Sequence, residues 1–302
     1  MFELWIPITI TAAFMQNVRS ALQKHLKSKL STGGATYVRF FYAVPLALLY
    51  AVSLHNGFGH ALPTPNLTFA IFGVIGGVSQ IVATALLVYL FSFRNFAVGT
   101  TYSKTETVQA AIFGLVILGD TIGTSAIIGI MISLVGVMAI SMARQKTGMK
   151  GLLTSLTQKT ALIGLASGAA FGISAVAYRA SSLALGGEGF LMQASFTLVC
   201  VTVLQALIMT VYLKVREPGQ ITAVIRNWKV AGLVGLSGML GSACWLTAMT
   251  IQNVAYVRAL GQVELVFTFI ASYAFFKERT NRVEFIGIMA IIAGIVVLLL
   301  GR

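Results

Sequence analysis

The sequence predicts an all-α membrane protein with ten transmembrane helices, arranged as two inverted five-helix repeats. Three observations lead to this fold class: an apolar composition, ten long apolar segments, and a similarity between the two halves of the chain. Of the 302 residues, 57% are hydrophobic and only 10% are charged, whereas soluble domains carry about 25% charged residues. Such a chain cannot cover a surface that faces water, so we interpret it as an integral multi-pass protein of the lipid bilayer.

Each predicted helix rests on a run of mostly apolar residues. A helix crosses the hydrocarbon core of a bilayer with ~20 such residues. Ten runs of this kind follow one another with short connections. They cover residues 4–22, 35–54, 67–91, 96–118, 122–142, 160–182, 189–213, 230–250, 254–276 and 283–301.

Glycines at helical spacing predict close contacts between these helices, because a small residue lets a neighbouring backbone approach. The sixth segment carries a stripe of three glycines four residues apart. The fifth and tenth segments each carry a pair seven residues apart. The positions are Gly164, Gly168 and Gly172, then Gly129 with Gly136, and Gly287 with Gly294.

The two halves of the chain resemble each other at a shift of 158 residues. Over residues 95–136, ten of 42 positions are identical without a gap, and Glu106 falls on Glu264. This similarity indicates a duplicated five-helix unit. Because five is odd, the second unit must enter the membrane from the opposite side, which is typical of secondary transporters with a site near the midplane. We predict a first repeat over 1–145, a basic cytoplasmic linker over 146–158 and a second repeat over 159–302.

The basic residues predict the orientation. Seventeen of the 21 Lys and Arg fall in or beside the odd-numbered connections, and the positive-inside rule places those connections in the cytoplasm, with both termini outside. The same placement accounts for the net charge of +13 by attraction to the anionic inner leaflet, without nucleic acid. The four other basic residues are Lys104, Arg179, Arg258 and Arg302.

Two buried glutamates are the strongest functional candidates. Glu106 and Glu264 lie about ten residues into their segments, or ~15 Å at 1.5 Å per residue, near the middle of a ~30 Å core. A charge at that depth costs about 2.5–3.5 kcal/mol, and a cost incurred at two equivalent positions indicates a function. Because burial favours the protonated form of a carboxyl group, we expect these glutamates to bind a proton or a cationic substrate group. The alternative is an ion-pair network that only holds helices together.

The neighbours of the glutamates suggest a cavity wall. Tyr102, Ser103, Glu106 and Gln109 share one helical face, and Gly261, Glu264 and Thr268 share another. Lys104 points to a different face from Glu106, so it either bridges to Glu264 or extends toward the basic connection.

Other polar and aromatic residues are weaker candidates, because packing or hydrogen bonding between helices accounts for them equally well. Arg39 could pair with a substrate carboxylate or extend to the interface. Aromatic rings could contact an amine or an apolar ligand. These candidates are Gln16, Asn17, Arg39, Gln80, Tyr89, Tyr178, Gln193, Gln205, Trp245 and Tyr256.

The paired segments SKTETVQAAIFGLVILGD (103–120) and GQVELVFTFIASYAFFKE (261–278) resemble the EamA-type signature of the drug/metabolite transporter superfamily. The glycine-bearing segments that follow them, Lys24, Arg179 and the pair Arg39-Phe40 fit the same pattern. The resemblance implies ten helices around a central cavity, alternating access, and export of small metabolites such as amino acids. It also implies cytoplasmic termini, contrary to the charge count. Thr107 and Leu265 stand where the family has proline after the buried glutamate, so a proline-induced break is not expected there.

We therefore expect a secondary transporter, most simply a proton-coupled exporter of amino acids or other amine-bearing metabolites, in the bacterial inner (plasma) membrane. One chain holds both repeats, so we expect a monomer. A facilitative permease and a membrane scaffold remain as alternatives. We expect no enzyme activity, cofactor, metal or nucleic-acid partner, because the sequence has no P-loop, HExxH or Gly-x-Ser-x-Gly motif.

Overall fold

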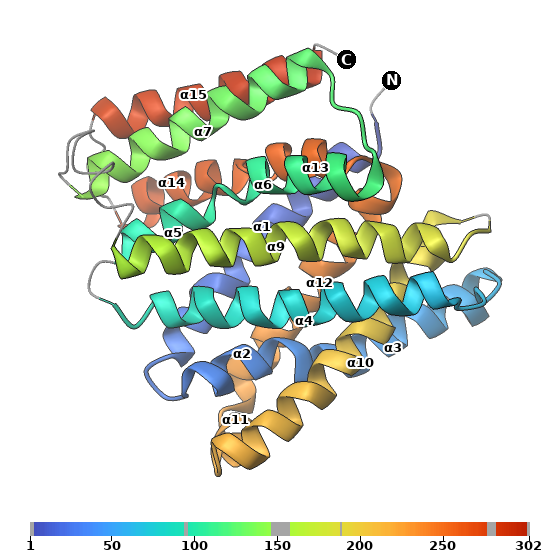
Figure 1. Ribbon diagram of the computed structural model, residues 1–302. Coiled ribbons are helices and arrows are strands. Elements are labelled where there is room, and N and C mark those ends of the chain that lie inside the picture. Colours follow the sequence, from blue (N-terminus) through green and yellow to red (C-terminus); the bar gives the residue numbers. More distant parts are fainter. Residues whose placement is uncertain (1–2, 94–95, 146–157, 188, 277–281, 301–302) are drawn as a thin grey trace.

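The computed structural model describes residues 3–93, 96–145, 158–187, 189–276 and 282–300, and this part of the chain is helical with no β-strand (Figure 1). The predicted linker over 146–158 lies outside the described residues except for residue 158. The all-helical class follows from the apolar composition, because a helix satisfies its backbone hydrogen bonds internally, as a bilayer requires.

The first half of the chain forms helices that match its five predicted segments. Two of these segments end in short π-helical turns, η1 and η2, and two are divided between consecutive helices. The elements are α1 (Trp5–Leu26), α2 (Thr32–Phe41), α3 (Ala43–Val52), η1 (Ser53–Gly57), α4 (Leu67–Leu90), α5 (Phe96–Ser103), α6 (Glu106–Phe113), η2 (Gly114–Leu118) and α7 (Thr124–Gln145).

The second half repeats this order with one additional short helix, α11. The elements are α9 (Lys159–Ala184), α10 (Phe190–Arg216), α11 (Gln220–Arg226), α12 (Trp228–Ile251), α13 (Val254–Leu260), α14 (Val263–Phe276) and α15 (Arg282–Leu300).

Six helical stretches in the described part of the chain are long and apolar enough to cross a membrane by themselves. Large apolar side chains such as Leu49, Leu207 and Ile286 are exposed on the outside of the bundle, as expected of helices that face lipid. The six stretches are Thr32–Gly57, Leu67–Leu90, Lys159–Ala184, Phe190–Arg216, Trp228–Ile251 and Arg282–Leu300.

Side chains at several helix starts explain where those helices begin. The Ser31 hydroxyl accepts a hydrogen bond from the Gly34 amide at α2, at 2.9 Å. The Asn66 side chain accepts one from the Phe69 amide at α4, at 2.8 Å. Each cap satisfies an amide that has no partner within its helix.

The three most extensive helix contacts all join the two halves of the chain. Helix α1 packs on α12, α4 on α9, and α7 on α15. The shift of 158 residues carries α4 onto α12 and α7 onto α15, and a shift of 157 carries α1 onto α9. The duplication therefore relates the α1–α12 pair to the α9–α4 pair, and it relates the α7–α15 pair to itself. The halves interlock rather than standing as two separate bundles.

The α7–α15 pair is the most extensive contact between the halves, and Figure 1 shows the two helices side by side. A Cβ atom added at Gly129 would lie 2.5 Å from the Gly294 carbonyl oxygen. One added at Gly136 would lie 2.5 Å from the Gly287 carbonyl oxygen. The expected close contact at these four glycines is thus confirmed. The two contacts are equivalent, because the shift of 158 residues carries Gly129 onto Gly287 and Gly136 onto Gly294.

Candidate functional site

Both buried glutamates lie at breaks in their helices. Helix α5 ends at Ser103 and α6 begins at Glu106, while α13 ends at Leu260 and α14 begins at Val263. The expectation of continuous helices over 96–118 and 254–276 was therefore wrong. Each glutamate lies in the first turn of a half-helix, where the positive end of the helix dipole stabilises a carboxylate.

Hydroxyl groups shape the first break in place of proline. The Ser103 hydroxyl donates to the Thr100 carbonyl at 2.7 Å, and the Thr105 hydroxyl donates to the Tyr102 carbonyl at 2.6 Å. The backbone amide of Lys104 turns back to the Thr101 carbonyl at 2.9 Å. Such local hydrogen bonds compete with the regular helical ladder, so the helix tightens and stops.

A glycine shapes the second break. The Glu264 amide donates to the Gly261 carbonyl at 3.1 Å, and the Gln262 amide donates to the Ala259 carbonyl at 3.2 Å. A Cβ atom at Gly261 would lie 2.5 Å from the Trp245 ring. The absence of a side chain at Gly261 therefore lets the turn sit directly against the indole of α12.

The glycine stripe of α9 packs against the first break. A Cβ atom at Gly168 would lie 2.9 Å from the Ser103 carbonyl oxygen and 3.2 Å from the Glu106 amide nitrogen, and one at Gly172 would lie 3.2 Å from the Ala110 amide nitrogen. The close approach expected from this stripe is confirmed at Gly168 and Gly172, where the partner is the α5–α6 backbone.

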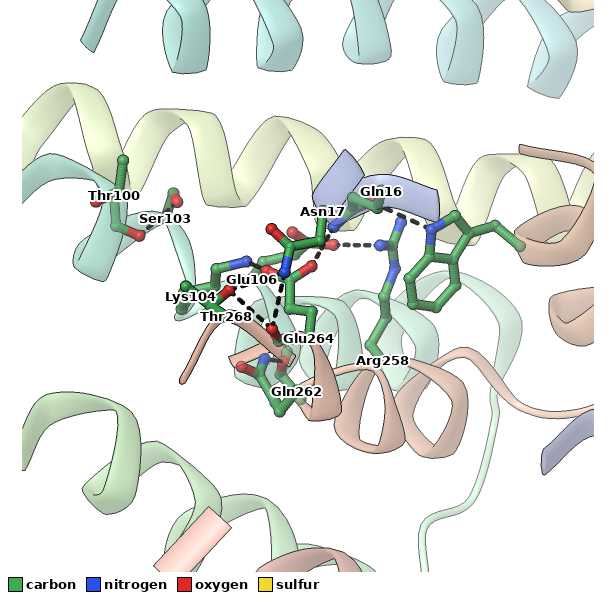
Figure 2. A network of polar contacts seen from close by, with 12 residues as sticks. Gln16, Asn17, Thr100, Ser103, Lys104, Glu106, Arg258, Gln262, Glu264 and Thr268 are labelled. Carbon is green, nitrogen blue, oxygen red and sulfur yellow. Dashed lines mark hydrogen bonds and ion pairs between the residues drawn. The ribbon is translucent and has the colours of Figure 1, made fainter. Parts of the chain in front are cut away.

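Each glutamate forms an ion pair with a basic residue from the other half of the chain (Figure 2). Lys104 from α5–α6 pairs with Glu264, and the Arg258 Nη1 atom lies 2.8 Å from Glu106 Oε1. Of the two alternatives for Lys104, the bridge to Glu264 is the one observed. The two ion pairs cross between the repeats, so the site is built by both halves together.

Helix α1 completes the surroundings of Glu264. The Gln16 side-chain amide donates to Glu264 Oε2 at 2.7 Å. The Asn17 amide donates to the Thr268 hydroxyl at 2.9 Å and, at 3.3 Å, to the Glu264 carbonyl. The Glu264 carboxylate of α14 therefore contacts α1 and the α5–α6 break at once.

Arg258, the basic partner of Glu106, is less exposed than Lys104, the basic partner of Glu264. The Arg258 guanidinium that pairs with Glu106 also stacks on Trp245, with its Cζ atom 4.6 Å from the ring centroid. The Trp245 indole donates to Gln16 Oε1 at 3.1 Å. One amide side chain thus links the surroundings of both glutamates.

A cavity of about 430 Å³ opens beside the ion pairs, large enough for a small metabolite. It is lined on α1, the end of α4, the α5–α6 break, α7, α9 and α14. The lining residues are Gln16, Asn17, Arg19, Ser20, Ala21, Lys24, Leu87, Phe91, Thr100, Thr101, Ser103, Lys104, Glu106, Val137, Ile140, Phe171, Glu264, Leu265 and Thr268.

The predicted polar face of the fourth segment is divided by the helix break. Ser103 and Glu106 line the cavity, whereas Tyr102 is buried near Ala161. The Gln109 amide donates to the Thr105 hydroxyl at 3.0 Å. The prediction of one shared face required an uninterrupted helix. The break at Lys104 and Thr105 rotates the residues of α6 relative to those of α5, so the four side chains do not share a face.

Arg39 and Gln80 belong to a second polar cluster, which lines a much smaller pocket outside the central cavity. Arg39 is buried and donates from Nη1 to the Thr84 hydroxyl at 2.9 Å. Gln80 accepts from the Tyr178 hydroxyl and from the Gln205 amide, both at 3.0 Å. The alternative in which Arg39 extends to the membrane interface was wrong, because the side chain lies inside the bundle.

A third group lies further along α9, which we call the Arg179 cluster: Arg179, Asp120 and Tyr256. Arg179 Nη1 donates to the carbonyls of Met249 and Gln252 at 2.5 and 2.7 Å, and its Nε lies 3.6 Å from Asp120 Oδ2. The Tyr256 hydroxyl accepts from the Gly123 amide at 3.3 Å. Arg179 is eight residues beyond Phe171, or ~12 Å along the helix. Tyr256 contacts Gly123, three residues after Asp120, and is not among the residues that line the cavity.

Sequence reasoning missed two arginines. Arg258 was only named among the basic residues outside the odd-numbered connections, yet it pairs with Glu106. Arg19 was counted with the basic connections, yet it lies within α1, is 3% exposed and lines the cavity. Arg39 is also buried, so fifteen rather than seventeen basic residues support the orientation predicted from the charges. A cation within an apolar run was the available signal for both.

The fold and the site define a polytopic helical membrane protein with a polar cavity at the breaks of two duplicated helices. The sequence model of the EamA-like transporter family matches residues 3–142 and again residues 158–300. The chain belongs to the EamA-like transporter family, as the resemblance of its paired segments implied.

Other comparisons bear on the fold. No curated protein matches the chain. A solved structure titled "Crystal structure of protein" matches with a TM-score of 0.71 and 15% identity, over 100% of this chain and 98% of its own. At that identity the similarity concerns the fold alone.

Proposed function

We propose that this membrane transporter moves a small metabolite by alternating access around the central cavity, as a secondary active transporter. The observation that supports the proposal most directly is the crossed pair of ion pairs: both halves of the chain contribute to one polar site beside a cavity of about 430 Å³. Movement of one half against the other would change both ion pairs together.

The proposed architecture has ten membrane crossings in two inverted five-helix units. The exchange of the α1–α12 and α4–α9 pairs supports a two-fold relation between the halves. The self-paired glycine contacts of α7 and α15 support the same relation. One chain supplies both units, so we propose a monomer.

The proposed access route leads from the cavity toward the basic connections. Lys24 and Phe91 line the cavity near the ends of α1 and α4, which continue into connections that the charge count assigns to the cytoplasm. In the other direction along α9, the Arg179 cluster ties together the ends of α12, η2 and α13. We propose that this arrangement is the inward-facing state, with termini outside.

Glu264 is the proposed proton carrier, and outward transport is the direction that the family suggests. Its carboxylate faces the cavity and holds Lys104, Gln16 and the break of α14 in place. Protonation would weaken the ion pair to Lys104, since a neutral carboxyl group attracts a cation far less. That change supplies a local trigger for rearrangement at the interface of the halves.

We do not propose selectivity for amines. It rested on glutamates free to bind an amine, and both glutamates already hold a basic side chain of the protein.

Purified protein in proteoliposomes tests the proposal. We expect an imposed pH gradient to drive uptake of a labelled metabolite from a panel of amino acids, organic acids and amines, with accompanying proton movement. Glu264→Gln should abolish the response to the gradient, whereas Glu217→Gln, the same change outside the cavity, should leave it intact. Exchange of substrate in Glu264→Gln at the wild-type rate and with the wild-type proton flux would refute the role of Glu264. Exchange without proton flux in the wild-type protein would favour a facilitative permease, and the absence of any flux would favour a scaffold.

A further inference from the structure

The charges around the cavity do not balance. Glu106 is matched by Arg258 and Glu264 by Lys104. Arg19 remains: it lines the same cavity and has no hydrogen bond or ion pair within the described residues. Apart from Lys24 near the end of α1, which also lines the cavity, three cations therefore face two carboxylates, and the excess charge is positive.

Arg19 is buried without an ion-pair partner among the described residues. Its side chain is 3% exposed, and its Nε atom is buried without an acceptor. Its stem packs on α12, where the Arg19 Cδ atom would lie 3.5 Å from a Cβ atom added at Gly238. The Arg19 stem is thus packed between helices while its Nε–H donor is unused.

Arg39 adds a second cation directly behind Arg19. Its Cγ atom would lie 3.4 Å from the same added Cβ at Gly238, so the two stems rest side by side on one glycine. Its hydrogen-bond acceptor is the neutral Thr84 hydroxyl. Among the described residues neither arginine forms an ion pair with a carboxylate: Glu106 attracts both from a distance but is paired with Arg258. Arg39 therefore adds a further positive charge to the excess.

Burying an uncompensated cation is costly, and proteins usually pair such a group or use it to bind a ligand. A guanidinium presents its donors in a planar fork that matches the two oxygens of a carboxylate or phosphate. Ser20, the residue after Arg19, also lines the cavity and adds a hydroxyl donor to its wall.

We propose that Arg19 binds an oxyanion of the transported molecule, so that the substrate class is a small carboxylate or phosphate compound. This inference rests on the proposed transport function and specifies the ligand of the same cavity. Both glutamates are occupied by the crossed ion pairs, and Arg19 binds the oxyanion. Arg39, which packs beside Arg19 on Gly238, adds to the positive potential there.

Binding is tested separately from transport, by thermal unfolding of the purified protein. The probes are succinate, inorganic phosphate, and 1,4-diaminobutane, which has the four-carbon length of succinate with opposite charge. We expect succinate or phosphate to raise the melting temperature of the wild-type protein and 1,4-diaminobutane to leave it unchanged. In Arg19→Gln the apparent affinity for the anion should fall on the order of tenfold to a hundredfold. Arg226→Gln, the same change at an exposed arginine of α11, should respond like the wild type.

Arg19→Lys keeps the charge but removes the fork, so its response should be intermediate. We also expect unliganded Arg19→Gln to melt at a higher temperature than the wild type, because it relieves an uncompensated buried charge. Anion stabilisation that is equal in Arg19→Gln and the wild type would overturn the assignment. No stabilisation of the wild type by either anion would also overturn it.

Proteoliposome flux distinguishes the two proposals. Transport of 1,4-diaminobutane and not of the anions would support transport and overturn the anion site. Anion binding that depends on Arg19, without flux of the bound anion under any gradient, would support the site and contradict the transport function. Succinate flux and phosphate flux, measured separately, tell a carboxylate substrate from a phosphate one.

Discussion

Glu106 and Glu264 occupy equivalent positions in the two repeats, yet their surroundings differ. The Arg258 side chain beside Glu106 is 9% exposed and stacks on Trp245. The Lys104 side chain beside Glu264 is 23% exposed, and the amide contacts to Glu264 come from α1. The two carboxylates are about equally exposed, at 13% and 12%, so the difference lies in their partners: the Arg258 guanidinium is covered by an aromatic ring, whereas the flexible ammonium of Lys104 lies at the cavity wall.

This difference shows how one duplicated carboxylate can acquire two roles. A guanidinium stacked on an indole is held by several contacts, so the Glu106 pair suits a fixed connection between the halves. A partly hydrated lysine is easier to release. We therefore expect Glu106 to contribute mainly to stability and Glu264 mainly to transport.

The largest expected effect follows from neutralising Glu106. Glu106→Gln leaves the enclosed Arg258 charge without a partner, which should lower the free energy of unfolding by roughly 3–5 kcal/mol. Glu264→Gln should cost much less, because Lys104 can reach water. Unfolding of both variants by SDS titration in mixed micelles checks the order, and an equal loss would remove the proposed division of roles.

A double substitution sharpens the same contrast. Glu106→Gln combined with Arg258→Gln removes both charges, so it should recover about 2–3 kcal/mol of the loss caused by Glu106→Gln alone. The corresponding pair of Lys104→Gln and Glu264→Gln should show a smaller coupling. The measurement is a double-mutant cycle on the unfolding free energy, and additive effects at Glu106 and Arg258 would contradict a fixed ion pair.

The glycine stripe of α9 offers a way to disturb the surroundings of Glu106 alone. Gly168→Ala places a methyl group 2.9 Å from the Ser103 carbonyl oxygen, so it should cost about 1–3 kcal/mol of stability. Gly232→Ala on α12 is the matched control, because no atom lies within 4 Å of a Cβ there. Thermal unfolding of the two variants tests this, and equal melting temperatures would show that the α9 contact is loose.

The smallest effect should come from Trp245. Trp245→Phe keeps an aromatic face for Arg258 but removes the indole donor to Gln16, which should cost about 1 kcal/mol. Because Gln16 also donates to Glu264, the proton dependence of transport should shift in this variant. An unchanged pH profile would indicate that the two glutamates act independently.

Much of the fold could be predicted from local sequence. The apolar runs located the helices, and the shift of 158 residues identified the duplication and its two glutamates. The bridge from Lys104 to Glu264 was one of two alternatives that helical geometry allowed. The four glycines of α7 and α15 correctly marked a close helix contact, because small residues at regular spacing have few other uses in a membrane helix.

The helix breaks could not be predicted in the same way. The first break depends on hydroxyl groups that fold back on their own helix, and the second on a glycine fitting against Trp245 from another helix. The partners of Glu106 and the isolation of Arg19 were also beyond sequence reasoning. Gln16 and Glu264 are 248 residues apart, and no local periodicity encodes which distant side chains meet.

The interlocking of the halves has a consequence for biosynthesis. Helix α1 leaves the ribosome first, yet its main partner is α12, and α4 and α7 also wait for partners from the second half. Until those partners arrive, Gln16 and Lys104 have no Glu264 to bind. We expect the nascent first half to remain loosely assembled, so that chain completion triggers folding of both halves together.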